Sequence, residues 1–132
     1  MEGTRREARE RAVSLLYEAE LKDQEPDEVL ADLPLPPEEF VVDLVSGVGK
    51  HQARIDELIA AHAIDWTLER MAAVDRNILR LAVYELLERP DIPAAAVLSE
   101  AVELATRYST DESSRFVNGL LASVAKDVRP PS

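Results

Sequence analysis

The chain has 132 residues, with 15 lysines and arginines against 26 aspartates and glutamates, so its formal net charge is −11. Its length suits one domain with a single core, and an apolar fraction of 46% is typical of a globular protein. The absence of cysteine excludes disulfide scaffolds, thiolate metal clusters and cysteine nucleophiles, and no apolar run approaches the ~20 residues of a membrane helix. We therefore expect a soluble, cytoplasmic protein that is not bound to a membrane, with residues 1–132 in one domain and a flexible tail at 129–132.

Proline and glycine divide the sequence into segments with helical periodicity, and there is no alternating pattern typical of strands. The expected helices are a first one from Thr4 to before Pro26, at most a short one at 27–33, a long one at 37–62, and three more at 71–89, 93–108 and 111–128. The longer segments carry apolar stripes at the spacing of amphipathic helices. The sequence thus predicts an all-α fold, a compact bundle of about six helices.

Glycines inside two of the predicted helices are unusual, because glycine costs a helix ~1 kcal/mol relative to alanine. Gly47 and Gly49 in the long helix suggest a kink. The pair Asn118-Gly119 interrupts the apolar stripe of the last helix. A glycine there predicts that another helix or a ligand approaches the backbone closely. Close packing of another helix is the simpler of these two explanations.

Charge is unevenly distributed along the chain. Residues 1–22 contain five basic and five acidic residues and are neutral overall, so the remaining 110 residues carry the whole net charge of −11. Helical spacing places Arg5, Arg6 and Arg9 on one face of the first helix. This face is either a solvated surface with Arg–Glu pairs or the one long stretch where a polyanion would not meet a net negative field.

Catalytic and ligand-binding motifs are absent from the sequence. Residues 46–50 superficially resemble a phosphate-binding loop, but Leu44 stands where that loop needs glycine and His51 stands where it needs serine or threonine. The two histidines, His51 and His62, have no companion residues at metal-ligand spacing. We therefore expect no enzyme, no metal and no cofactor.

Four charged residues lie on or beside the apolar helix predicted at 71–89. They are Asp75, Arg76, Arg80 and Glu85. We expect them to form structural ion pairs with the helix that carries Glu100 and Glu103.

Three stretches carry a family resemblance. They are residues 5–12 followed by Leu16-Tyr17, residues 75–82 followed by Glu85-Leu86, and residues 92–121, in which Phe116-Val117-Asn118-Gly119 is the most specific string. In order and spacing they resemble the NusB family of bacterial transcription antitermination factors, from about residue 4 to residue 128. The resemblance implies a NusB-like fold and a non-catalytic adapter. With the ribosomal protein NusE, such an adapter would bind boxA-type single-stranded RNA in nascent rRNA transcripts and help to assemble an antitermination complex on RNA polymerase.

The resemblance also implies site residues. The RNA-binding residues would be Arg5, Arg6 and Arg9 at the start of the first helix, together with Tyr17, Arg115 and Phe116. The partner-binding residues would be the acidic Glu69, Asp75 and Glu112. Glu7 departs from the family pattern, because it stands where a longer basic run is often found. For Phe116 and Tyr17, a position in the core stays open beside an RNA contact.

Two other functions stay open at this point. The chain could be a purely protein-binding helical adapter whose arginines are ordinary surface residues. It could also be a homodimer that masks its own RNA site.

Overall fold

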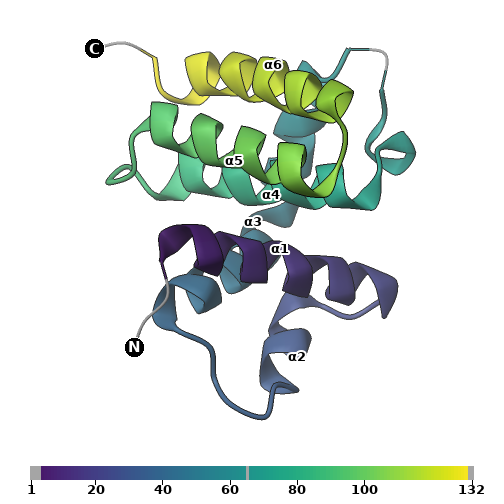
Figure 1. Cartoon of the computed structure of the whole chain (residues 1–132), viewed down its shortest axis with the longest axis vertical. Coiled ribbons are helices and arrows are strands. Elements are labelled where there is room, and N and C mark those ends of the chain that lie inside the picture. Colours follow the sequence, from purple (N-terminus) through teal and green to yellow (C-terminus); the bar gives the residue numbers. More distant parts are fainter. Residues whose placement is uncertain (1–3, 65, 131–132) are drawn as a thin grey trace.

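The computed structural model describes residues 4–64 and 66–130, which form six α-helices and one short 3-10 helix, η1, with no strand (Figure 1). The elements are α1 (Arg5–Leu21), α2 (Pro26–Ala31), α3 (Glu39–His62), η1 (Leu68–Arg70), α4 (Ala73–Glu88), α5 (Ala94–Tyr108) and α6 (Asp111–Val128). The prediction of an all-α bundle of about six helices is confirmed. None of these helices is long and apolar enough to span a lipid bilayer.

Helix starts follow local sequence signals. The Thr4 side chain caps α1 by accepting a hydrogen bond of 3.1 Å from the backbone N–H of Glu7. Thr110 caps α6 in the same way, with 3.0 Å to the N–H of Ser113. Pro26 opens α2 rather than only terminating the preceding segment, because a proline fits the first helical turn, where no backbone donor is needed.

Helix α4 is the centre of the bundle. It packs against α1, α3, α5 and α6, and most of its circumference is buried. Its apolar residues join side chains from the other α-helices in one hydrophobic core. Helix α5 packs closely on α4 and α6, whereas its connection to α1 is made by long polar side chains. We call this boundary between α1 and α5, which polar side chains bridge, the seam; Tyr17 and Tyr108 lie on it.

The glycines inside helices have different explanations. Helix α3 runs without interruption through Gly47 and Gly49, and a Cβ atom at Gly47 would overlap the ring of Tyr84 from α4. Gly47 therefore lets α4 approach α3. Gly119, by contrast, is exposed, and a Cβ atom there would meet no other atom within 4 Å. The expected close helix packing at Gly119 is therefore wrong.

The C-terminal end of α6 is anchored to the loop between α4 and α5. The Arg129 guanidinium donates hydrogen bonds of 2.5–2.9 Å to four backbone carbonyls, those of Glu85, Leu86, Arg89 and Ile92. The flexible tail expected at 129–132 therefore does not begin at Arg129, and residues 131–132 lie outside the described residues. Carbonyls at the end of a helix lack intrahelical partners, which explains why an arginine is held there.

Candidate functional site

Arg9 does not lie on the surface of α1. Its residue is 5% exposed, and its guanidinium forms a two-pronged ion pair with Glu85 of α4, which is 1% exposed. The distances are 2.7 Å from Nη2 to Oε1 and 3.0 Å from Nε to Oε2. The expectation that Arg9 contacts RNA is wrong in this structure, because a buried guanidinium that compensates a buried carboxylate is not available to a phosphate.

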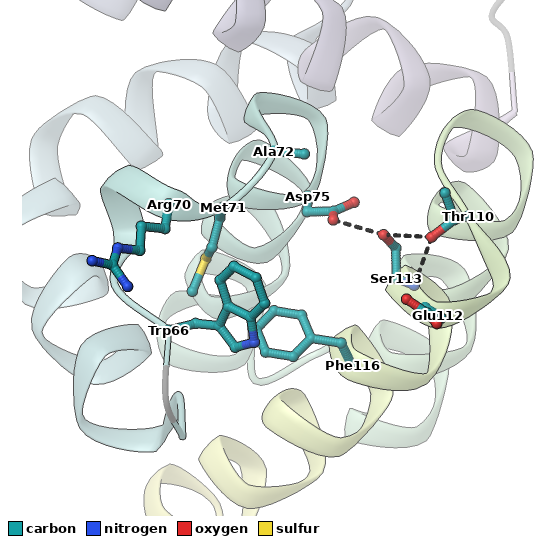
Figure 2. Close-up of a pocket in the computed structure, with 9 residues that line it drawn as sticks. All are labelled: Trp66, Arg70, Met71, Ala72, Asp75, Thr110, Glu112, Ser113 and Phe116. Atoms are coloured by element: carbon teal, nitrogen blue, oxygen red, sulfur yellow. Dashed lines mark hydrogen bonds between the residues drawn. The ribbon is translucent and has the colours of Figure 1, made fainter.

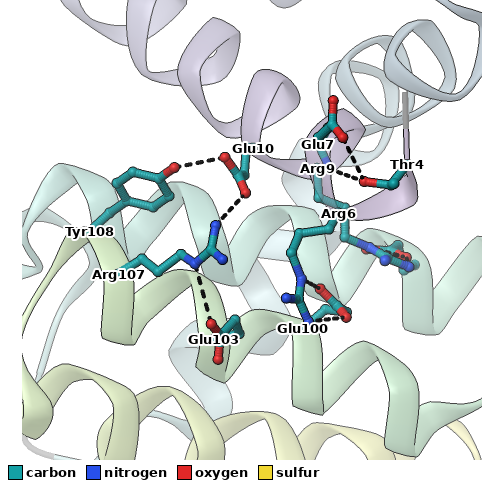
Figure 3. Close-up of polar contacts among 10 residues, drawn as sticks. Thr4, Arg6, Glu7, Arg9, Glu10, Glu100, Glu103, Arg107 and Tyr108 are labelled. Atoms are coloured by element: carbon teal, nitrogen blue, oxygen red, sulfur yellow. Dashed lines mark hydrogen bonds and ion pairs between the residues drawn. The ribbon is translucent and has the colours of Figure 1, made fainter. Parts of the chain in front are cut away.

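Arg6 is exposed but already paired. Its Nε and Nη2 donate to the two carboxylate oxygens of Glu100 on α5, at 3.1 and 3.2 Å, while 45% of its side chain stays exposed (Figure 3). The hydrogen bond from Arg6 lowers the pKa of Glu100, so this carboxylate stays charged at neutral pH. Arg6 can reach a phosphate only by sharing its charge with Glu100 or by leaving it.

Arg5 carries the most available positive charge of the three arginines. Its Cζ lies 4.6 Å from the ring centroid of Phe40 at the start of α3, and no ion pair of Arg5 is found among the described residues. A second guanidinium, that of Arg89, lies 5.2 Å from the same ring. Arg89 is neutralised by Asp43 and Asp91, and its hydrogen bond lowers the pKa of Asp91 to about 2. The ring therefore holds one uncompensated cation at the start of α1.

Three of the four charged residues predicted to pair with α5, namely Arg76, Arg80 and Glu85, pair with α1 or α3 instead, and Asp75 forms no ion pair among the described residues. Arg76 donates to Glu20 of α1 at 2.5 and 2.8 Å, and Arg80 donates to Glu20 at 3.2 Å and to Asp56 of α3 at 2.8 Å. These hydrogen bonds lower the pKa of Glu20, and the bond from Arg76 contributes most. The predicted partner is wrong because α4 turns its charged edge toward α1 and α3, while α5 covers another face.

Tyr17 lies at the surface, on the seam between α1 and α5. It is 36% exposed and lines a groove of about 490 Å³ together with Tyr108, which is 52% exposed. Glu10 of α1 accepts hydrogen bonds from the Tyr108 hydroxyl at 2.7 Å and from Arg107 at 2.9 Å (Figure 3). Of the two possibilities left open for Tyr17, a position in the core is excluded.

A second cavity lies where α4 and α6 begin. Its volume is about 390 Å³, and Trp66, Asp75, Glu112 and Phe116 are among the residues around it (Figure 2). Asp75 is only 7% exposed, and its Oδ2 accepts a hydrogen bond of 2.7 Å from the Ser113 hydroxyl. Its other oxygen, Oδ1, is buried without a hydrogen-bond partner among the described residues. A buried carboxylate oxygen without a donor is costly, so holding Asp75 in this place lowers the stability of the fold.

Of the remaining predicted residues, Glu112 and Phe116 line this cavity, whereas Arg115 and Glu69 do not. Phe116 is half-buried, packs against the core and presents its ring beside the half-exposed Trp66 (Figure 2). Arg115 is exposed on the preceding position of α6. Glu69 is exposed on η1 but does not line the cavity. The structure thus brings Asp75, Glu112 and Phe116 together and leaves Glu69 beside them.

Three aromatic residues of these sites, Phe40, Trp66 and Tyr108, are not among the site residues that the family resemblance implies. A signal existed for two of them, because the single tryptophan lies outside any apolar stripe and Tyr108 is the last residue of its helix. Nothing local in the sequence indicates that arginines converge on Phe40.

Among the described residues, no group of three or more histidine, aspartate and glutamate side chains could hold a metal ion. His62 does lie between Ser123 and Asp127, at 2.6 Å from Nδ1 and 3.1 Å from Nε2. None of these three residues lines either cavity, and the arrangement joins the end of α3 to α6.

The chain is similar to known proteins in sequence. A family model described as the NusB family matches residues 6–126. The transcription antitermination protein NusB of Salinispora arenicola is 52% identical over 129 residues, covering 92% of this chain and 95% of the relative. The protein of that name from Acidothermus cellulolyticus is 52% identical over 126 residues, covering 91% and 86%.

Solved structures agree with the sequence comparison. NusB from T. maritima superposes with a TM-score of 0.85 at 35% identity, covering 96% of this chain and 94% of that one. A structure of the antitermination factors NusB and NusE in complex with double-stranded RNA contains a chain with a TM-score of 0.75 at 29% identity, covering 93% and 96%. The expected fold is thereby confirmed at the level of its overall architecture.

Proposed function

Because this chain belongs to the NusB family of transcription antitermination factors, we propose that it is a non-catalytic RNA-binding adapter. With the ribosomal protein NusE it binds boxA-type single-stranded RNA in nascent rRNA transcripts. It thereby helps to assemble the antitermination complex on RNA polymerase in the bacterial cytoplasm. The related structure that holds NusB and NusE with RNA supports both classes of partner.

The observation that carries this proposal is the separation of two charged sites. Arg5 is held with an uncompensated charge at the start of α1, whereas Asp75 and Glu112 meet at an acidic cavity on α4 and α6. A net charge of −11 repels RNA from most of the surface, so an available cation matters where it occurs. An acidic cavity complements a basic ribosomal protein, which raises the association rate and the selectivity.

Five of the predicted residues then have a role in binding. Arg5 supplies a phosphate contact, and Arg6 supplies another by exchanging Glu100 for the RNA. Tyr17 offers a ring to a base, and Arg115 extends the cationic surface toward α6. Phe116 was predicted to stack on RNA, but its place beside Asp75 favours contact with NusE instead. Because few phosphates are neutralised, the affinity should fall only gently with salt, by ~0.7 log units per contact and per log unit of salt.

The test is a fluorescence-anisotropy titration of boxA RNA and of a scrambled RNA, with and without NusE, at two salt concentrations. The double variant R5E/R6E should weaken boxA binding at least about tenfold and reduce the salt dependence. The control K50E/R54E makes the same change in net charge at exposed positions of α3 and should have a much smaller effect. Equal effects of the two variants, or no effect of either, would overturn the RNA assignment.

The same titration separates the other two functions. A purely protein-binding adapter would bind NusE but would not distinguish boxA from scrambled RNA in any mixture. A homodimer that masks its RNA site would show a molar mass that rises with concentration in light scattering, and its RNA affinity would fall in parallel.

A further inference from the structure

The seam between α1 and α5 is held open by polar side chains. Arg6 pairs with Glu100 near one end of the seam, and Glu10 pairs with Arg107 and Tyr108 near the other (Figure 3). The closely packed helix pairs of the bundle do not include α1 with α5. Long side chains that meet at their tips keep the two helix backbones apart, and a groove remains between them.

Two tyrosines and two valines give this groove an aromatic and apolar lining. Tyr17 and Tyr108 contribute surface-exposed rings from α1 and α5, and Val13 and Val74 add aliphatic surface from α1 and α4. The chain has three tyrosines, and the third, Tyr84, is 5% exposed in the core. Both exposed tyrosines therefore line one groove. Its volume of about 490 Å³ is ample for a planar aromatic ligand.

Among the charges at the edge of the groove, that of Arg11 can meet an anionic group of a ligand. The carboxylate of Glu10 is compensated by Arg107 and by the Tyr108 hydroxyl. Arg11 lines the groove and is exposed, and no ion pair of Arg11 is found among the described residues. Glu7 remains at the edge, where it interacts with the cap residue Thr4. A nucleotide combines the two required parts, a flat base for the rings and a phosphate for the arginines.

The groove lies between two groups of arginines that belong to the proposed RNA surface. Arg5 and Arg6 lie at the start of α1, and Arg115 lies on α6, so the two groups are on different helices. The groove lies between them, because Tyr108 ends α5 just before α6 begins, and Val74 precedes the cavity residue Asp75. A single strand of RNA that runs from α1 to α6 passes over this groove.

We propose that Tyr17 and Tyr108 form a nucleobase-binding groove that holds unstacked bases of the single-stranded RNA, with Arg11 at its edge as a phosphate contact. This inference rests on the proposed function and adds Tyr108 and Arg11 to the RNA-binding residues. Stacking on a tyrosine accepts any base, because every base has a π-face. The groove therefore contributes affinity for single strands, and the choice of sequence is made elsewhere.

The experiment compares Y17L, Y108L and Y108F in complex with NusE, by anisotropy with boxA RNA at several salt concentrations. Each leucine variant should weaken binding on the order of 5- to 150-fold, as expected for the loss of one stacked base. Y108F keeps the ring and loses only the hydroxyl bonded to Glu10, so it should bind like the unaltered protein. The slope of log affinity against log salt should stay unchanged in Y108L, because stacking releases no counterions.

Two controls separate stacking from a merely structural role. L21A removes an exposed apolar residue of α1 outside the groove and should leave RNA binding unchanged. The thermal midpoint of Y108L and its affinity for NusE without RNA should match those of the unaltered protein. In addition, RNA carrying 5-iodouridine should crosslink to Tyr108 on irradiation, at a site that mass spectrometry identifies.

The outcomes distinguish this inference from the proposed function. If R5E/R6E weakens RNA binding and Y108L does not, the groove is not a base site, while the proposed function stands. If the unaltered protein does not distinguish boxA from scrambled RNA, both fail together. If Y108L instead loses NusE binding without RNA, the groove is occupied by a protein and the inference is wrong.

Discussion

The first turns of α1 and the cavity at the starts of α4 and α6 are both charged regions, but they differ in how far their charges are satisfied within the chain. Of the three predicted RNA-binding arginines of α1, Arg9 is buried against Glu85 and Arg6 is paired with Glu100, while Arg5 has no ion pair among the described residues. At the cavity, Asp75 has a buried oxygen without any partner. The paired arginines at the start of α1 mainly stabilise the protein, whereas one carboxylate oxygen of Asp75 lacks a hydrogen-bond donor among the described residues.

The difference shows that charge counted along a sequence is not charge available to a ligand. Residues 1–22 were singled out because they are neutral within an acidic chain. Two of the three arginines that made this stretch interesting are engaged in ion pairs with α4 and α5. Three variants should test the contrast between the two regions, beginning with the largest expected effect.

Arg9→Met should have the largest effect, and it should act on stability. Removing one member of a buried ion pair leaves Glu85 uncompensated, which should lower the free energy of unfolding by about 3–5 kcal/mol. Urea denaturation followed by circular dichroism measures this. The double variant R9M/E85L should regain much of the loss, since well-packed apolar residues can replace a buried pair. Unchanged stability together with weakened RNA binding would mean that Arg9 belongs to the RNA surface after all.

Asp75→Asn should have an intermediate effect, and it should act on the partner. The amide keeps the shape of the side chain and a hydrogen-bonding group for Ser113 but removes the buried negative charge. We expect NusE binding to weaken by about 10- to 100-fold, or about 1.4–2.7 kcal/mol, in isothermal titration calorimetry. D23N, which removes an exposed carboxylate near the end of α1, is the matched control and should bind as before. Equal affinities of the two variants would show that the cavity is not the NusE site.

Phe40→Leu should have the smallest effect, and it should act through Arg5. Losing the ring removes a contact that is worth about 0.5–1 kcal/mol at an exposed site, so RNA affinity should fall about two- to fivefold. In an R5Q background, the same substitution should have no further effect on anisotropy titrations. If the effects of F40L and R5Q simply add, Phe40 does not hold Arg5 for RNA.

Much of the fold was predictable because helices depend on local signals. Thr4 and Thr110 cap their helices with side chains that lie three residues from the amides they bind. The apolar stripes identify most of the buried residues, and proline and glycine mark most boundaries. The family resemblance added the proposed positions of the site, most specifically through the string from Phe116 to Gly119.

The sequence was misleading where a residue's role depends on a distant partner. Arg9 and Glu85 are 76 positions apart, and no local pattern distinguishes a buried arginine on α1 from the exposed Arg5 and Arg6 beside it. Gly119 was expected to admit a neighbouring helix, yet it faces open space. Arg129 was expected in a flexible tail, yet it binds carbonyls about 40 residues earlier in the chain.

By itself, the sequence determined the all-α class, the order of the helices and the family to which the chain belongs, because periodicity, caps and motifs are written in neighbouring residues. Only the tertiary structure decided which charges remain available and where aromatic rings meet. Both depend on how helices far apart in the chain pack together. This packing buries Arg9 and leaves Arg5 exposed on Phe40. It also buries one oxygen of Asp75 without a hydrogen-bond partner among the described residues and brings Tyr17 and Tyr108 to the same groove.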